Sequence, residues 1–353
     1  MPSRRTTLQS VCALLAGVGA GCIGSSGPSS DRIRWRERIR GRPLLAGETL
    51  YIMDRLTLHA LSPTDGQTKW TVEYSESDFD QRLCLGSDIA VDGRRVYVPG
   101  CDGLRAFRRS DGENAWFVGS PLRAGVGVGD RRVYANADDL LAIDAASGDV
   151  DWRVSTGGER LTTPTATPDG VVFTNRVDGA VSAFDADGER RWQYRTDTET
   201  RSPAVVGDTV YVATSLEPGR SGRLVALNRA DGSVRWTADT PSPKRGTRPV
   251  VDGDAVYLGC SGREHGTLVA LDRTDGTERW SFTDGNSTVY QPAPAGDTVY
   301  AGSNDNNVYA LSRGGELRWQ VETNSVVGTV VAGDDLLYAA NNERLFAIER
   351  AGD

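Results

Sequence analysis

Few residues in this 353-residue chain have the types and spacing that catalysis requires. The chain has two histidines: His59 lies in an alternating run, LTLHA, that predicts a strand, and His265 lies in a polar stretch, SGREHG. A serine–histidine–aspartate triad needs one of them, and neither has a distinctive catalytic neighbourhood. Two histidines also cannot supply a three-histidine zinc site. We therefore predict no catalytic residues and no zinc centre.

The segment Ser303–Asn307, SNDNN, is rich in the side-chain oxygens that calcium prefers. A calcium loop of the EF-hand type needs alternating ligands, a central glycine and a glutamate at its twelfth position. No glutamate arrives in register, and the segment aligns with the turns at Asp102–Gly103 and Asp178–Gly179. The sequence therefore predicts a turn here and no metal site.

The first 22 residues have the pattern of an export signal, with a charged start, a short apolar run and small residues before Cys22. The pair Arg4-Arg5 resembles the twin-arginine signal, and the small residues before the cysteine resemble a lipobox. Gly19 stands where a leucine is usual, so a plain signal peptide with an incidental cysteine is the alternative. Residues 23–31 are predicted to form a flexible tether.

The charge balance restricts the partners. A formal net charge of −8 argues against nucleic acid, which needs a basic face. Only two of the 40 basic residues are lysines, and aspartate far outnumbers glutamate. This balance is typical of proteins from salt-loving archaea, and a GC-rich genome is the alternative explanation.

From residue 32 onward the chain is periodic. A unit of alanine, Asp-Gly or Ser-Gly turn and tryptophan repeats about every 41 residues, the length of a four-stranded propeller blade. Each unit also carries an aromatic residue in its predicted second strand. The repeated tryptophans are Trp70, Trp116, Trp152, Trp192, Trp236, Trp280 and Trp319. The aromatic residues are Tyr51, Tyr97, Tyr134, Phe173, Tyr211, Tyr257, Tyr300 and Tyr338.

The alanine and the aromatic residue occur eight times, but the tryptophan after the alanine occurs seven times, because the chain stops shortly after Ala347. The eighth tryptophan, Trp35, lies in Ile33–Glu37 at the other end. This strand is predicted to complete the last blade and leave no open sheet edge. The fold class is therefore all-β, an eight-bladed β-propeller of four-stranded blades spanning residues 32–353.

The repeated pattern A-x-D-x-x-[TSD]-G-x-x-x-W resembles the tryptophan-docking repeat of the pyrroloquinoline-quinone (PQQ) propellers, and the bare eight-bladed ring is similar to BamB-like lipoproteins. That resemblance implies a scaffold without catalytic activity. Quinoprotein dehydrogenases share the fold, but many have a neighbouring-cysteine disulfide, and their long insertions build a cofactor funnel; this chain has neither feature. We therefore expect no PQQ or other cofactor, with a PQQ-dependent dehydrogenase or a small-ligand sensor as the alternatives.

In such propellers the first strand of each blade lines the central channel. Arg42, Arg201, Arg248, Tyr290 and Gln291 stand just before predicted first strands, so several of them are expected at one channel mouth. Arginines there could bind a carboxylate or an acidic peptide. Salt bridges between neighbouring blades are the simpler interpretation.

Three cysteines remain after the signal: Cys84, Cys101 and Cys260. A two-residue turn at Asp92–Gly93 would place Cys84 directly opposite Cys101, close enough for a disulfide after a small adjustment. Two reduced thiols or a shifted register are the alternatives. Cys260 has no cysteine opposite and is predicted to be free.

These observations together predict an exported protein, anchored by lipid to the outer face of the cytoplasmic membrane. It would act there as a scaffold for an unidentified membrane or secreted protein. The assembly role of BamB does not transfer directly, because an archaeal cell has no bacterial-type outer membrane.

Overall fold

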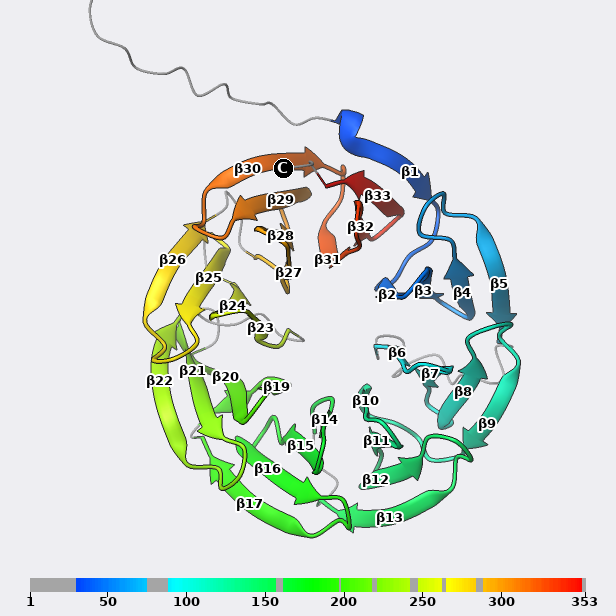
Figure 1. Ribbon diagram of the computed structural model, residues 1–353, viewed down its shortest axis with the longest axis vertical. Helices are drawn as coiled ribbons and strands as arrows, with labels where there is room; N and C mark the ends of the chain where they lie inside the picture. Colours follow the sequence, from blue (N-terminus) through cyan, green and yellow to red (C-terminus); the bar gives the residue numbers. More distant parts are fainter. Residues whose placement is uncertain are drawn as a thin grey trace, which may run out of the picture.

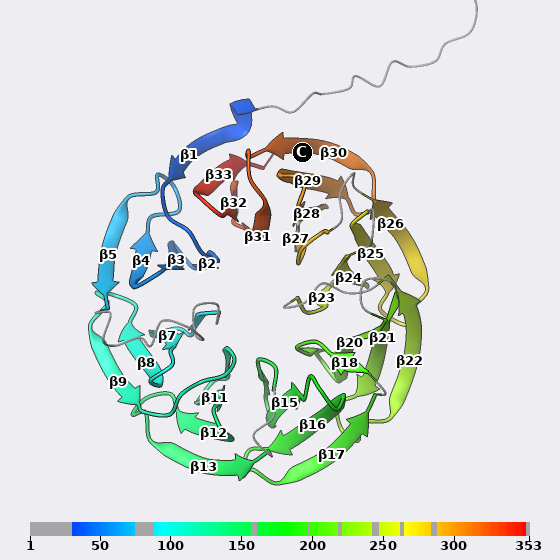
Figure 2. The ribbon, with the colours of Figure 1, turned by 180° about the vertical axis from the view of Figure 1, so that it is seen from behind.

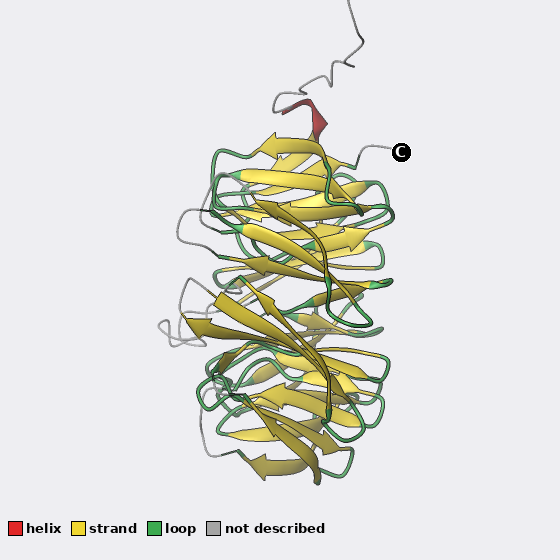
Figure 3. Cartoon of the chain, turned by 90° about the vertical axis from the view of Figure 1, so that its left-hand side faces the viewer, coloured by secondary structure: helices red, strands yellow, loops and turns green. Residues whose placement is uncertain are grey.

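The chain forms a single closed ring of eight antiparallel sheets in a computed structural model (Figure 1). The structure describes residues 30–74, 88–156, 161–196, 198–217, 221–241, 247–261, 265–283 and 288–350. Successive blades follow one another around the axis in chain order, as the view from behind also shows (Figure 2). Seen edge-on, the ring is flat and built almost wholly of strands (Figure 3). The predicted eight-bladed propeller is confirmed.

Each blade has four principal strands, ordered from the channel to the outer rim. Blade 1 comprises β2 (Leu44–Ala46), β3 (Thr49–Asp54), β4 (Thr57–Leu61) and β5 (Thr68–Glu73), and blade 2 comprises β6 (Ala90–Val91), β7 (Arg95–Pro99), β8 (Leu104–Arg108) and β9 (Asn114–Val118). Blade 3 comprises β10 (Val126–Val128), β11 (Arg132–Asn136), β12 (Asp139–Asp144) and β13 (Val150–Ser155). Blade 4 comprises β14 (Thr165–Thr167), β15 (Gly170–Thr174), β16 (Ala180–Asp185) and β17 (Arg190–Arg195). Blade 5 comprises β19 (Ala204–Val206), β20 (Thr209–Glu217), β21 (Ser221–Asn228) and β22 (Val234–Thr240). Blade 6 comprises β23 (Val250–Asp252), β24 (Ala255–Cys260), β25 (Thr267–Asp272) and β26 (Glu278–Thr283). Blade 7 comprises β27 (Ala293–Ala295), β28 (Thr298–Gly302), β29 (Asn307–Ser312) and β30 (Leu317–Glu322). Blade 8 comprises β31 (Val327–Ala332), β32 (Leu336–Asn341), β33 (Leu345–Glu349) and β1 (Ile33–Glu37), and a 3₁₀ turn, η1 (Ser30–Arg32), precedes β1.

The core lies between the blades rather than within one of them. The second strands are mostly buried, and β24 is buried along its whole length, because both faces of the sheet are covered by neighbouring blades. The outer strands instead alternate between exposed and partly buried residues, as in β13. This alternation is expected for a strand with one face packed and one face in water. The burial pattern explains why the middle strands are nearly continuous apolar runs.

The ring closes through its two ends, as the sequence predicts. Strand β1 pairs antiparallel with β33, and Trp35 stands opposite Ala347. The Trp35 ring lies 6.0 Å from that of Tyr338 in the same blade. Its indole N–H donates a 3.1 Å hydrogen bond to the Pro63 carbonyl of blade 1. The first residues of the ring therefore hold its last blade to its first.

Blade 5 has a fifth strand that the repeat pattern does not predict. Strand β18 (Glu199–Thr200) pairs with β20 beyond the end of β19, where β20 is unusually long. The Thr200 hydroxyl donates to the Asn175 carbonyl of blade 4 at 3.0 Å. This extra strand joins blades 4 and 5 beside the channel.

The register predicted around Cys101 is wrong by two residues. Val91 pairs with Val96, and Ala90 with Tyr97, so the turn is Gly93–Arg94 rather than Asp92–Gly93. The Asp92 side chain causes the shift by accepting the backbone N–H groups of Arg94 and Arg95, both at 2.6 Å. The described ladder therefore does not have the register from which Cys84 was predicted to lie opposite Cys101.

Cys101 is nevertheless disulfide-bonded. Its predicted partner, Cys84, lies outside the described residues, so that pairing stays a prediction. Cys260, at the end of β24, is free and buried, as predicted.

Candidate functional site

Each repeated tryptophan docks against the next blade. Seven of the eight indole N–H groups donate to a backbone carbonyl of the following blade, at 2.7 to 3.1 Å. The acceptor is always the third residue after the motif alanine; Trp70, for example, donates to Arg109, which follows Ala106. Because a buried indole N–H needs a partner, this bond fixes the spacing between alanine and turn. The predicted role of the tryptophans as wedges between blades agrees with this geometry.

The turn glycine of the motif has a second reason to be glycine. It adopts positive φ, as at Gly276 with φ +79°, and it also lies directly on the docked tryptophan of the preceding blade. A Cβ built on Gly276 would lie 2.5 Å from the Trp236 ring, closer than carbon atoms can approach. A Cβ on Gly112 or Gly232 would lie 2.7 or 2.6 Å from the ring of Trp70 or Trp192, respectively. Turn and tryptophan therefore form one docking unit across each blade junction.

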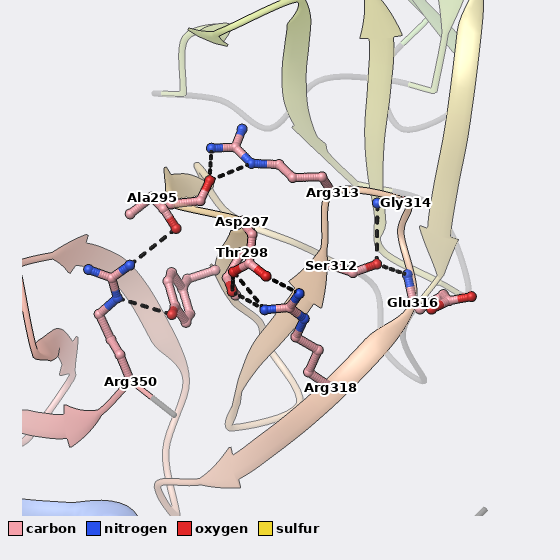
Figure 4. A network of polar contacts seen from close by, with 11 residues as sticks. Ala295, Asp297, Thr298, Ser312, Arg313, Gly314, Glu316, Arg318 and Arg350 are labelled. Atoms are coloured by element: carbon pink, nitrogen blue, oxygen red, sulfur yellow. Dashed lines mark hydrogen bonds and ion pairs between the residues drawn. The ribbon is translucent and has the colours of Figure 1, made fainter. Parts of the chain in front are cut away.

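Arginines also bridge several of these blade junctions through hydrogen bonds to the first hairpins of the blades. Arg350 in blade 8 donates from Nε to the Tyr300 hydroxyl of blade 7 at 3.1 Å and from a terminal nitrogen to the Ala295 carbonyl at 3.2 Å (Figure 4). Arg313 reaches the Gly296 carbonyl in the same view, at 3.0 Å. The equivalent pairs elsewhere are Arg109 with Tyr51, Arg273 with Tyr211 and Arg313 with Tyr257. These arginines are structural.

A cavity of about 780 Å³ opens on the channel. Its walls include the inner strands β2, β6, β10, β14 and β31, and its mouth reaches the residues before β19, β23 and β27. All five residues predicted at the channel mouth line it: Arg42, Arg201, Arg248, Tyr290 and Gln291. The sequence therefore located this mouth, although the five side chains differ in how they are held.

Arg42 and Arg201 are held by carboxylates. Arg42 of blade 1 pairs with Asp88 of blade 2 at 2.8 Å, and both side chains are half exposed. The Arg201 side chain is 4 % exposed and pairs with Glu199 at 3.3 Å. The inter-blade salt bridge considered from the sequence is thus the arrangement at Arg42. Arg201 is buried at the mouth rather than presented openly.

Arg248 is exposed, whereas Tyr290 and Gln291 are partly buried. The Tyr290 hydroxyl donates a 2.8 Å hydrogen bond to Oδ1 of Asn304 in the neighbouring turn. Burial raises the pKa of Tyr290, although the positive charge of Arg42 opposes this shift. Arg42 therefore acts electrostatically on blade 7 as well as blade 2.

Several cavity residues that were not predicted share one repeat position with Arg42, Arg248 and Gln291. Counting back five residues from the first hairpin turn of each blade gives one cavity-lining residue in every blade. These residues are Arg42, Asp88, Gly125, Thr163, Ser202, Arg248, Gln291 and Thr329. Aligning the blades on this turn, rather than on the tryptophan, would have revealed the complete ring.

Arg123 and Arg176 also line the cavity and were not predicted. Arg123 pairs with Asp138 at 2.6 Å, and both side chains are mostly exposed. Arg176 follows Asn175, whose carbonyl is bonded to β18. Within the described part of the chain, Arg176 and Arg248 form no ion pair with a carboxylate. Positive charge is therefore concentrated on one arc of the mouth, in blades 4 to 6.

The other chemical candidates have structural positions. His59 is paired within blade 1 between β3 and β5, and burial lowers its pKa. Ser303–Asn307 forms the turn between β28 and β29, where Asp305 accepts the Asn307 N–H at 3.0 Å and the Tyr309 hydroxyl. No group of three or more His, Cys, Asp or Glu in the described ranges is arranged to hold a metal ion. The same ranges contain no helix long and apolar enough to cross a membrane.

The fold and its docked tryptophans define the class of protein: an eight-bladed propeller of the PQQ-repeat type. The family described as "Outer membrane protein assembly factor BamB" matches residues 16–116, 102–259 and 245–353. The chain belongs to this family.

Two curated relatives carry the same description. BamB of Burkholderia pseudomallei is 31 % identical over 157 residues, which are 40 % of this chain and 39 % of that protein. BamB of Shewanella oneidensis is 26 % identical over 140 residues, 35 % of each chain. The chain thus aligns with less than half the length of these relatives.

Solved structures share the fold at lower identity. BamB of Moraxella catarrhalis superposes with a TM-score of 0.71 at 18 % identity, covering 91 % of this chain and 98 % of that one. A quinohemoprotein alcohol dehydrogenase of Pseudomonas putida gives the same TM-score at 15 % identity, covering 91 % and 76 %. The fold therefore serves both an assembly factor and a redox enzyme, so function must be argued from the site.

Proposed function

We propose that the chain is an exported, lipid-anchored propeller that binds another membrane or secreted protein and catalyses no reaction. Membership of the BamB family is the observation that carries this proposal. The rigid ring supports it, because tryptophan hydrogen bonds join successive blades at seven of the eight junctions, and a rigid frame can hold a docking surface in place. The particular partner of BamB is not carried over, since the matched segments are partial and the outer membrane is specific to certain bacteria.

Chemical crosslinking in cells tests the scaffold role. The native protein, crosslinked and purified, is expected to retain one membrane or secreted protein at a defined stoichiometry. A matched sample of the ring alone, residues 30–353, expressed without its export signal, controls for partners met in the wrong compartment. Purification of the exported chain with no crosslinked protein would contradict the proposal.

The anchor is tested through residues outside the described part of the chain. Changing Arg4-Arg5 to Lys-Lys should retain the protein inside the cell, because the export receptor reads the arginine pair. Cys22→Ser should release the exported protein into the medium. If the serine variant stays on the membrane, the predicted lipid anchor is wrong, but the proposed scaffold role is unaffected.

A PQQ-dependent dehydrogenase is the second candidate, supported by the fold shared with quinohemoprotein alcohol dehydrogenases. The residues of the cavity do not fit a calcium-bound quinone. Among the described lining residues Asp88 is the single carboxylate, and it is paired with Arg42, whereas calcium needs six to eight oxygen ligands that usually include several carboxylates. Adding PQQ and calcium should therefore leave the visible absorption spectrum unchanged, and dye-linked alcohol oxidation would restore the enzymatic alternative.

A third candidate is a small-ligand sensor, for which the arginine-lined cavity is the favouring observation.

High-salt adaptation is also part of the proposal, suggested by the acidic, lysine-poor composition. A melting temperature that rises strongly between low salt and molar potassium chloride would support it, and a flat response would support the GC-rich genome instead.

A further inference from the structure

The charge at the channel mouth is distributed unevenly. Five arginines line the cavity, but Asp88 is the single acidic lining residue that the structure describes. Asp88 lies in blade 2 and is paired with Arg42 of blade 1. Blade 2 is opposite blade 6 in a ring of eight, so this carboxylate is remote from Arg248. One side of the mouth is therefore nearly neutral, while the other side carries positive charge.

The positive side is a built structure rather than a chance group of surface side chains. We name Arg176, Arg201 and Arg248 the cationic arc; they come from blades 4, 5 and 6. The Thr200–Asn175 hydrogen bond joins the residues that directly precede Arg201 and Arg176. A second bond, from the Thr174 hydroxyl to the Arg201 carbonyl at 3.1 Å, strengthens the same junction. The backbone carrying two of the three arginines is thus fixed before any ligand binds.

Charge within the arc is only partly compensated. Arg201 has Glu199 as its partner, whereas Arg176 and Arg248 have no carboxylate partner in the part of the chain that the structure describes. Guanidinium groups prefer carboxylates that they can bind through two parallel hydrogen bonds. Thr163 and Ser202 line the same mouth and add hydroxyl groups to it. The complementary ligand is therefore rich in carboxylates.

The size of the cavity restricts the form of that ligand. A volume of about 780 Å³ falls within the ~300–1,000 Å³ that holds a drug-sized molecule. A folded domain cannot enter it, but a short extended chain can. Because the two arginines without a described carboxylate partner, Arg176 and Arg248, come from different blades, a segment with several carboxylates along it matches better than a single small acid. Leu45, Val91 and Val331 of the inner strands also line the cavity and add apolar residues to its wall.

We infer that the cationic arc binds an extended acidic segment of the partner protein, with glutamate or aspartate carboxylates on Arg176 and Arg248. This inference rests on the proposed scaffold function and supplies the chemistry of its contact. The net charge of −8 gives the rest of the surface the opposite sign. Acidic segments are therefore attracted to the mouth and repelled elsewhere, which favours one docking position.

Binding of a fluorescein-labelled hexaglutamate peptide to the full ring tests the inference by fluorescence anisotropy at 50 mM and 150 mM salt. The wild-type protein should bind it, with weaker binding at the higher salt. Arg176→Gln/Arg248→Gln should weaken binding about tenfold or more, because two charge-assisted contacts are lost. The control, Arg36→Gln/Arg153→Gln, changes the net charge equally at exposed outer-strand positions and should bind within about twofold of wild type.

Three results would overturn the inference: no binding to hexaglutamate, an equal loss in both double variants, or equally tight binding of free glutarate, which would make the ligand a small acid. Melting curves of all variants should coincide, since neither arginine of the test pair is in an ion pair that the structure shows. The scaffold role is judged separately, by crosslinking. If the Arg176→Gln/Arg248→Gln protein still captures the wild-type partner in full, the scaffold stands and the arc is not its contact. If hexaglutamate binds but no partner is captured, the site stands and the scaffold fails.

Discussion

Replacing Gly276 with alanine tests whether the turn glycine is required by the docked tryptophan or by backbone conformation alone. Two glycines of blade 6 make the comparison possible. Gly276, with φ +79°, lies against the Trp236 ring, whereas Gly253, with φ +59°, has no atom within 4 Å of a Cβ built on it. Both substitutions place alanine in the left-handed region, so they share the backbone cost and differ in the clash.

The expected magnitudes follow from these two contributions. An L-residue in the left-handed region costs roughly 1–2 kcal/mol, so Gly253→Ala should reduce the free energy of unfolding by about that amount. The Cβ of Gly276→Ala would lie 2.5 Å from Trp236 Cε3. Relieving this contact requires moving the indole from its 3.1 Å hydrogen bond to the Arg273 carbonyl. Overpacking of this kind adds roughly 1–3 kcal/mol, giving a total near 2–5 kcal/mol for Gly276→Ala.

Equilibrium urea denaturation, followed by circular dichroism, measures both variants. The same pair of substitutions in a Trp236→Leu background completes the design as a double-mutant cycle. There the extra cost of Gly276→Ala should largely disappear, because the smaller side chain leaves room for the Cβ. Equal costs for the two glycines in the wild-type background would refute the idea that tryptophan docking selects the turn glycine.

Three further predictions concern the seam, acid stability and thiols. Deleting Ile33–Arg38 should cost at least the ~3–5 kcal/mol typical of losing a large buried aromatic, read from the urea midpoint; an unchanged midpoint would place β1 elsewhere. Stability should fall with acid, because hydrogen bonds from Arg108 and the Glu113 backbone lower the pKa of Asp111 to about 2. The contribution of Asp111 to stability is complete above its unfolded pKa near 4 and disappears as the pH falls toward 2. Urea midpoints measured across this pH range test this, and Asp111→Asn should reduce their dependence on pH. Thiol titration of the denatured, unreduced mature protein should find one thiol beyond any at Cys22, namely Cys260, because Cys101 is disulfide-bonded; three thiols would contradict this.

The architecture could be predicted because the repeat marks every blade with the same residues at the same spacing. Counting tryptophans and motif alanines was enough to place Trp35 in the last blade, and the β1–β33 ladder confirms it. The positions just before the strands that line the channel were predictable for the same reason. The proline-marked positions at Arg42 and Arg248 do precede inner strands.

Side-chain pairing across blades could not be predicted from the same pattern. The register of the first hairpin in blade 2 differs from the predicted one by two residues, because the Asp92 carboxylate accepts hydrogen bonds from two backbone N–H groups. The repeat pattern does not show such a local interaction. Arg201 is buried directly after β18, an extra strand that the repeat does not predict. Arg176 lies in the turn between β15 and β16, and its place at the cavity follows from the closed ring.

The closure of the ring also sets an order for folding. Blades 1 to 7 each take their four principal strands from one continuous stretch of chain, so each can form as soon as that stretch is available. Blade 8 cannot, because β1 must meet β33; Arg34 and Glu349, which form an ion pair across this ladder, are 315 residues apart in the sequence. Closing so long a loop is entropically costly until the intervening blades have shortened it. The seam is therefore expected to form last, once the whole chain has been synthesised, and the first strand must wait unpaired until then.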